Sequence, residues 1–88
     1  FVVTTGSSTI RVNDPSHGRI TGNTVVFSNV NTLNNFNSSS GFTSAVLTTS
    51  TGYVITVTNI NNYTFNASSG TATITSIIGG GSVTAQTI

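Results

Sequence analysis

The sequence predicts a small all-β domain, an antiparallel β-barrel or sandwich of about six to seven short strands. β-Branched and aromatic residues dominate its apolar runs, and these residues favour strands. Turn signals rich in Gly, Asn and Ser separate the runs at intervals of about 8 to 12 residues. No segment repeats its apolar residues with the period of about 3.6 residues that indicates a helix. The chain of 88 residues forms one domain at most, residues 1–88.

The composition is polar but almost free of charge. Charged residues make up 3% of the chain and its net charge is +1, whereas about 25% of an ordinary soluble domain is charged. Ser, Thr and Asn supply 42 of the 88 residues. Such a neutral surface is typical of secreted, surface-layer and virion proteins. A core of this size gives marginal stability and no cysteine cross-links it, so we expect oligomerisation or a place in a longer chain.

Three strands are predicted in the first 28 residues. Residues 1–4 are apolar and β-branched and fit a first or edge strand. Residues 9–12 alternate between apolar and polar side chains, with Arg11 on the outer face. Residues 23–28 place apolar side chains on both faces, which predicts a central strand.

The side chains that carry charge, and the only histidine, lie together in residues 11–19. Asp14-Pro15 and His17-Gly18 are turn sequences, because Asp bonds the backbone two residues on and Gly accepts a positive φ. We therefore expect a polar, conformationally fixed connection between two strands. Its structural turn residues are Asp14, Pro15, His17, Gly18 and Gly22.

Within this connection His17 and Asp14 have specific expected contacts. The ring nitrogens of His17 are expected to bond nearby backbone groups, with partner binding as the alternative. Asp14 can pair with Arg19 or Arg11, and such a surface contact is worth roughly 0 to 1 kcal/mol.

Residues 29–41 have loop composition, with five Asn and three consecutive Ser. A loop of this length is functional or packed against a partner. Leu33 and Phe36 are apolar anchors within it. We expect them to fold back onto the core; the alternative is contact with a neighbouring subunit, in which Asn35 and Asn37 would take part.

The strongest local signal is a β-hairpin. Residues 53–58 and 63–67 both alternate, and the Asn-rich residues 59–62 join them. Tyr53, Tyr63 and Phe65 are expected to pack in the core or across strands; a base-stacking platform is the alternative. Tyr53 and Tyr63 are also candidate partner contacts. The other segments predicted as strands are 42–47, 71–78 and 82–88, with a flexible break at the glycines 79–81.

The side chains offer little for catalysis or ligand chemistry. General acid–base work with two carboxylates is excluded because Asp14 is the only one. Asp14, Ser16 and His17 lie too close in sequence for a catalytic triad, and one His with one Asp is too few ligands for a metal. Two arginines cannot neutralise the roughly 6 to 10 phosphates of a nucleic-acid interface. No apolar run reaches the roughly 18 to 20 residues of a membrane-spanning helix. We expect no enzyme, cofactor, metal, nucleic acid or membrane insertion.

Several of these residues form a pattern that resembles a known module. His17-Gly18-x-x-x-Gly22-x-x-Val25-x-Phe27 is followed by Gly52-Tyr53-x-Ile55-x-Val57 and Asn59-x-Asn61-x-Tyr63-x-Phe65. The pattern resembles a recurrent module of tailed-phage structural proteins. That module is similar to the first catalytic cysteine half-domain (FCCH) of ubiquitin-activating enzymes, a small β-barrel.

The resemblance covers roughly residues 9–83, and its first half is the more specific. The chain departs from the module at Arg19, where an apolar residue is usual, and in the loop 29–41. The resemblance implies a structural or adhesive building block within long virion proteins, without ubiquitin chemistry.

The sequence thus predicts a non-catalytic structural or assembly module of a tailed-phage particle, in its tail, fibre or capsid surface. Its expected partners are other virion chains and copies of itself. One alternative is an adhesin module that binds host surface glycan through Tyr53, Tyr63 and neighbouring Asn side chains. A second alternative is a self-associating subunit of an extracellular filament, in which neutral strands stack between identical chains.

Overall fold

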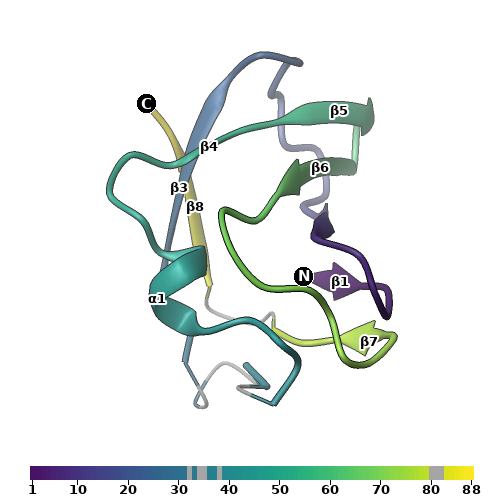
Figure 1. Ribbon diagram of the computed structural model, residues 1–88. Helices are drawn as coiled ribbons and strands as arrows, with labels where there is room; N and C mark the ends of the chain where they lie inside the picture. The colour runs from purple at the N-terminus through teal and green to yellow at the C-terminus, as the bar shows by residue number, and fades with distance from the viewer. Residues whose placement is uncertain (32, 34–35, 38, 80–82) are drawn as a thin grey trace.

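The structure is a computed structural model that describes residues 1–31, 33, 36–37, 39–79 and 83–88. Within these residues the chain forms a five-stranded and a three-stranded antiparallel sheet, with one short helix beside them (Figure 1). The predicted all-β antiparallel fold is confirmed.

The larger sheet has the strand order β5-β6-β2-β1-β7. Its strands are β1 (Val2–Val3), β2 (Thr9–Asn13), β5 (Thr56–Asn59), β6 (Asn62–Asn66) and β7 (Ser76–Ile77). Strand β2 alternates as predicted, because Ile10 and Val12 are buried while Arg11 faces solvent. Strand β1 is not an edge strand, since β7 pairs with its other side.

The smaller sheet has the order β4-β3-β8. Its strands are β3 (Thr24–Ser28), β4 (Tyr53–Val54) and β8 (Thr84–Thr87). The prediction that residues 23–28 form a central strand is confirmed. Val25 and Phe27 point into the core and Val26 is half-buried on the outer face.

The predicted hairpin is confirmed as β5 and β6, which are joined by Ile60 and Asn61 and pair with one register shift. The predicted strand 53–58, however, is divided at Ile55 between the two sheets. The backbone N–H of Ile55 donates to Asn23 and its carbonyl accepts from Gly22, each at 3.0 Å. Alternation continues through this residue, because Ile55 is buried between the sheets.

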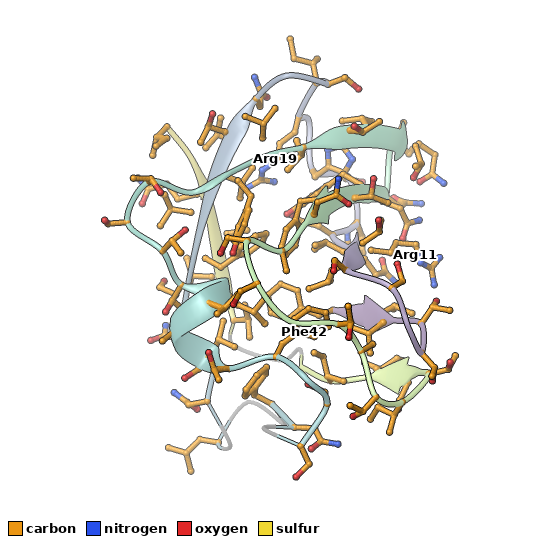
Figure 2. All side chains as sticks on the ribbon, viewed as in Figure 1. Arg11, Arg19 and Phe42 are labelled. Atoms are coloured by element: carbon orange, nitrogen blue, oxygen red, sulfur yellow. The ribbon has the colours of Figure 1, made fainter. Side chains whose placement is uncertain are left out.

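The prediction of a strand at 42–47 is wrong, because residues Ser44–Leu47 form the helix α1. The side chain of Thr43 accepts a hydrogen bond from the backbone N–H of Val46 at 3.2 Å, which satisfies a donor of the first turn. The helical turn carries Leu47 into the core, and Phe42 is buried beside it (Figure 2).

The predicted strand 71–78 is reduced to β7. Ala72 bonds instead to the turn after β1: its N–H donates to Ser7 and its carbonyl accepts from Gly6. The last strand is likewise shorter than the predicted 82–88. Residues 80–82, which include two glycines of the predicted break, lie outside the described residues, as does Asn35.

The core lies between the sheets and is rich in aromatic rings. Phe1, Phe27, Phe65 and Tyr53 form a series of ring contacts with centroids 4.5 to 6.3 Å apart. One backbone approach at its margin requires glycine. Gly41 has a φ of +100°, and a Cβ there would overlap the carbonyl oxygen of Thr71.

Candidate functional site

The polar connection that follows β2 lies along the outer edge of β5. Because β5 is the last strand of its sheet, its outward backbone groups would otherwise face solvent. Two hydrogen bonds of 2.9 Å reach Val57 and Asn59 on this edge, and three of 3.0 to 3.2 Å hold the adjoining residues Ile55 and Ile60. They join His17, Thr21, Gly22 and Asn23 to Ile55, Val57, Asn59 and Ile60. The connection therefore closes an edge that could pair with another chain.

His17 fixes the middle of this connection through both ring nitrogens. Nδ1 accepts from the backbone N–H of Arg19 at 2.8 Å, and Nε2 lies 2.9 Å from the carbonyl oxygen of Asn59. These partners assign the proton to Nε2, because the carbonyl can only accept. The ring also meets Tyr63 edge-on, with centroids 5.2 Å apart. The expected backbone bonding of His17 is thus observed, and neither nitrogen bonds Asp14 or Ser16.

Arg19 joins the two sheets. Its guanidinium donates to the Asp14 carboxylate at 2.8 Å, directly after β2, and to the Ala85 carbonyl in β8 at 2.9 Å. It also lies over the Tyr63 ring, 5.7 Å from its centroid, and the Tyr63 hydroxyl donates to Asp14 at 3.2 Å. We call Asp14, Arg19, Tyr63 and Ala85 the Arg19 clasp.

The Arg19 clasp is more buried than the surface contact that the sequence suggested. The side chain of Arg19 is 13% exposed and that of Asp14 31%. In Figure 2 Arg19 lies among the strands, whereas Arg11 projects from the outer face of the larger sheet. Of the two arginines that could pair with Asp14, only Arg19 does so.

Burial also changes the proton affinity of Tyr63. Desolvation raises the pKa of its hydroxyl well above the usual range, and the nearby charge of Asp14 raises that pKa further. Arg19 acts in the opposite direction but does not offset these effects. The hydroxyl therefore stays protonated and continues to donate to Asp14.

A pocket of about 300 Å³ opens beside the clasp, between the end of β2 and β8. Polar groups of Asn13, Asp14 and Arg19 line part of it. The apolar lining comes from Phe1, Val12, Pro15, Phe27, Val83 and Ala85. Such a pocket has the size and mixed lining that would fit a small polar molecule with an apolar face.

The candidate partner contacts fall into two groups. Leu33 is 91% exposed and Asn37 is also exposed, although its backbone N–H bonds the Ile78 carbonyl. Phe36, Tyr53 and Tyr63 are buried. Phe36 therefore folds back onto the core as expected, Leu33 does not, and neither tyrosine ring lies at the surface. The tyrosines pack as expected from their alternation.

The sequence did not reveal the groups that complete the site from a distance. The carbonyls of Ala85 and Asn59 belong to ordinary strand or hairpin sequence. Only the fold brings them to the charged connection. Of the five turn residues, Gly18 and Gly22 adopt the positive φ angles that glycine accepts readily.

In the described part of the chain no three His, Cys, Asp or Glu side chains gather in a group that could hold a metal. None of the helices described there is long and apolar enough to cross a membrane. Comparison of the chain with models of protein families, with curated proteins and with solved structures gave no match. The likeness to the phage module therefore rests on the motif residues alone and stays a prediction.

Proposed function

We propose that this chain is a non-catalytic structural module of a tailed-phage particle, a component of its tail, fibre or capsid surface. One observation carries the proposal: the charged residues are used inside the chain itself. Asp14 and Arg19 pair with each other and hold the sheets together. Arg11 is the only other charged side chain, so the remaining surface is neutral.

A neutral surface favours close packing in an assembly. The centres of protein interfaces are depleted in charged residues, and copies without net charge repel one another little. Large apolar side chains also remain exposed on this surface. They are Ile20, Leu33, Val54, Ile60, Ile77 and Ile88. When a neighbouring chain covers these apolar side chains, few charged groups beside them have to be desolvated.

The geometry around His17 supports a non-catalytic role. A nucleophilic hydroxyl needs a base within hydrogen-bond reach, and that base needs a free nitrogen. Both nitrogens of His17 are occupied by backbone groups. The ring thus stabilises the connection that covers β5.

Electron microscopy of particles from the native source tests this function. An antibody against the chain should label fixed, symmetric positions, with a constant copy number per particle by quantitative mass spectrometry. The same antibody after adsorption with purified chain is the control. Particles without label, together with a free monomer in the soluble fraction, would contradict the proposal.

The pocket beside the Arg19 clasp favours one second candidate, a glycan-binding module. Because the rings of Tyr53 and Tyr63 are buried, the sugar would lie against Phe1, Asn13 and Asp14 instead. A glycan array with the chain should then give saturable, sugar-specific signals that Asn13→Ala reduces. Uniformly flat signals would rule this candidate out.

A further inference from the structure

The edges of the two sheets are not equally protected. In the described part of the chain these edges are β5 and β7 in the larger sheet and β4 and β8 in the smaller. The polar connection covers β5, and Arg19 occupies the Ala85 carbonyl on β8. A bare edge presents N–H and C=O groups that another strand can bond, and proteins usually blunt it. Uncharged groups of the connection therefore cover β5, and Arg19 blocks one outward carbonyl of β8. Among the described residues no such contact covers the outer sides of β4 and β7.

The outer side of β7 is centred on Ile77. The N–H of Ile78 donates to the Phe1 carbonyl at 2.9 Å, so in the antiparallel ladder Ser76 and the N–H of Ile78 face β1. The carbonyl of Ile78 instead accepts from the backbone N–H of Asn37 at 2.9 Å, at the end of the strand. The N–H and C=O of Ile77 consequently point away from the sheet. Its side chain is 72% exposed, and among the described residues its carbonyl meets only the Ser76 hydroxyl, at a long 3.4 Å.

The segment around this two-residue strand is held against β1 and carries no charge. Bonds to residues 1–5 hold the segment 75–79 against β1, from Thr75 at one end to Gly79 at the other. No charged residue occurs in residues 71–79. At β4, by contrast, the chain leaves for the other sheet directly after Val54, at Ile55. Figure 1 shows β7 at the rim of the fold, beyond β1.

We propose that the outer edge of β7 joins two copies of this chain, antiparallel across a twofold axis. The partner is a second copy because the edge is complementary to itself: a twofold axis places Ile77 opposite Ile77 of the other copy, N–H to C=O in both directions. The two exposed isoleucines then form an apolar cross-strand pair. No charge in either segment opposes the approach. The inference rests on the proposed function, because it names the edge through which copies assemble.

The geometry of this pair suggests a direct test. Directly opposed, hydrogen-bonded residues of antiparallel strands have Cα atoms about 5.5 Å apart, which lies within the range that a disulfide spans. The chain contains no cysteine, so Ile77→Cys introduces its only thiol. Ile60→Cys is the matched control, since Ile60 and Ile77 are both 72% exposed.

Mild oxidation of each purified variant, followed by non-reducing electrophoresis, measures the cross-linking. We expect Ile77→Cys to form disulfide dimers about tenfold faster than Ile60→Cys at the same concentration, because pairing holds its thiols together. Val54→Cys reports on the β4 edge in the same way. Equal rates at residues 77 and 60, or faster cross-linking at residue 54, would overturn the proposal.

Sedimentation measures the same edge without a covalent bond. Ile77→Lys places like charges opposite each other and should raise the dimer dissociation constant by about tenfold or more, whereas Ile60→Lys should leave it unchanged. Near-ultraviolet circular dichroism checks that both variants are folded. A wild-type chain that stays monomeric at millimolar concentration, or equal effects of the two substitutions, would refute the edge. Particles that are labelled at regular positions, together with a purified chain that stays monomeric, would refute this inference alone. A dimer that depends on Ile77, together with particles that carry no label, would refute the proposed function.

Discussion

The Arg19 clasp makes a quantitative prediction for Arg19→Ala. The substitution removes the ion pair with Asp14 at 2.8 Å, the bond to the Ala85 carbonyl at 2.9 Å and the contact with the Tyr63 ring. The substitution therefore removes the link between the end of β2 and β8. Among the described residues no other ion pair is present to replace it. Asp14 keeps one partner, the Tyr63 hydroxyl.

The size of the effect follows from burial. A hydrogen bond to a charged group contributes about 1.5 to 3 kcal/mol net, whereas an exposed ion pair contributes about 0 to 1 kcal/mol. Arg19 is 13% exposed and Asp14 31%, so this pair lies between those limits. The Nε of Arg19 is buried without a partner among the described groups, which offsets part of the gain. We expect Arg19→Ala to lower the free energy of unfolding by about 2 to 4 kcal/mol.

Urea denaturation followed by circular dichroism measures this change. Arg11→Ala is the control, because Arg11 is exposed and makes no ion pair or side-chain hydrogen bond in the described chain; its effect should stay within about 0.5 kcal/mol. A double-mutant cycle of Arg19→Ala and Asp14→Ala should give a coupling energy of about 1 to 2 kcal/mol between residues 14 and 19. A loss below about 1 kcal/mol for Arg19→Ala would show that the pair is only a surface contact and refute the reasoning.

Three further predictions concern single residues. Because the pKa of Tyr63 is raised in the folded chain, the unfolded chain loses this proton first. Stability should then fall above about pH 10 by up to about 1.4 kcal/mol per pH unit, and Tyr63→Phe should remove that slope in urea titrations from pH 8 to about 11.5. Gly41→Ala should cost more than about 3 kcal/mol by the same assay, because its Cβ overlaps a backbone carbonyl, whereas Gly6→Ala, with a positive φ but open space, should cost about 1 to 2 kcal/mol. Phe36→Ala should lower the free energy of unfolding by about 3 to 4 kcal/mol and lower the thermal midpoint accordingly, because Phe36 is buried. Leu33→Ala should leave the midpoint nearly unchanged, and similar losses for both variants would contradict their different burial.

The features that the sequence predicted well are local. The β5–β6 hairpin follows from alternation on both sides of an Asn-rich turn, and both signals lie within about a dozen residues. The central position of β3 follows from apolar residues on both of its faces. In each case the residues that determine the structure are neighbours in the chain, so the pattern contains the information.

The features that the sequence missed depend on distant contacts. Alternation runs unbroken through Ile55, but bonds to the turn at residues 22 and 23 transfer the chain to the other sheet there. Helix α1 has a single turn, too short to show helical periodicity, and it contains Val46, which also suits a strand. The local signals for it were the Thr43 cap and the helix formers Ala45 and Leu47. For the site, the sequence placed the charged residues in one turn but could not place Ala85, which lies 66 residues beyond Arg19.

The position of Arg19 connects the site to the edges of the sheets. An apolar residue at this position could fill the space beside Tyr63 but could not bond the Ala85 carbonyl. Strand β8 would then present another open edge, next to the pocket of about 300 Å³. An arginine fills the space with its stem and occupies the edge with its guanidinium. One side chain thus contributes both packing and edge protection, which explains why a chain with so few charges places one of them at 13% exposure. On this reasoning Arg19 hinders pairing of another chain at the Ala85 carbonyl, whereas the edge of β7 proposed for pairing carries no charged residue.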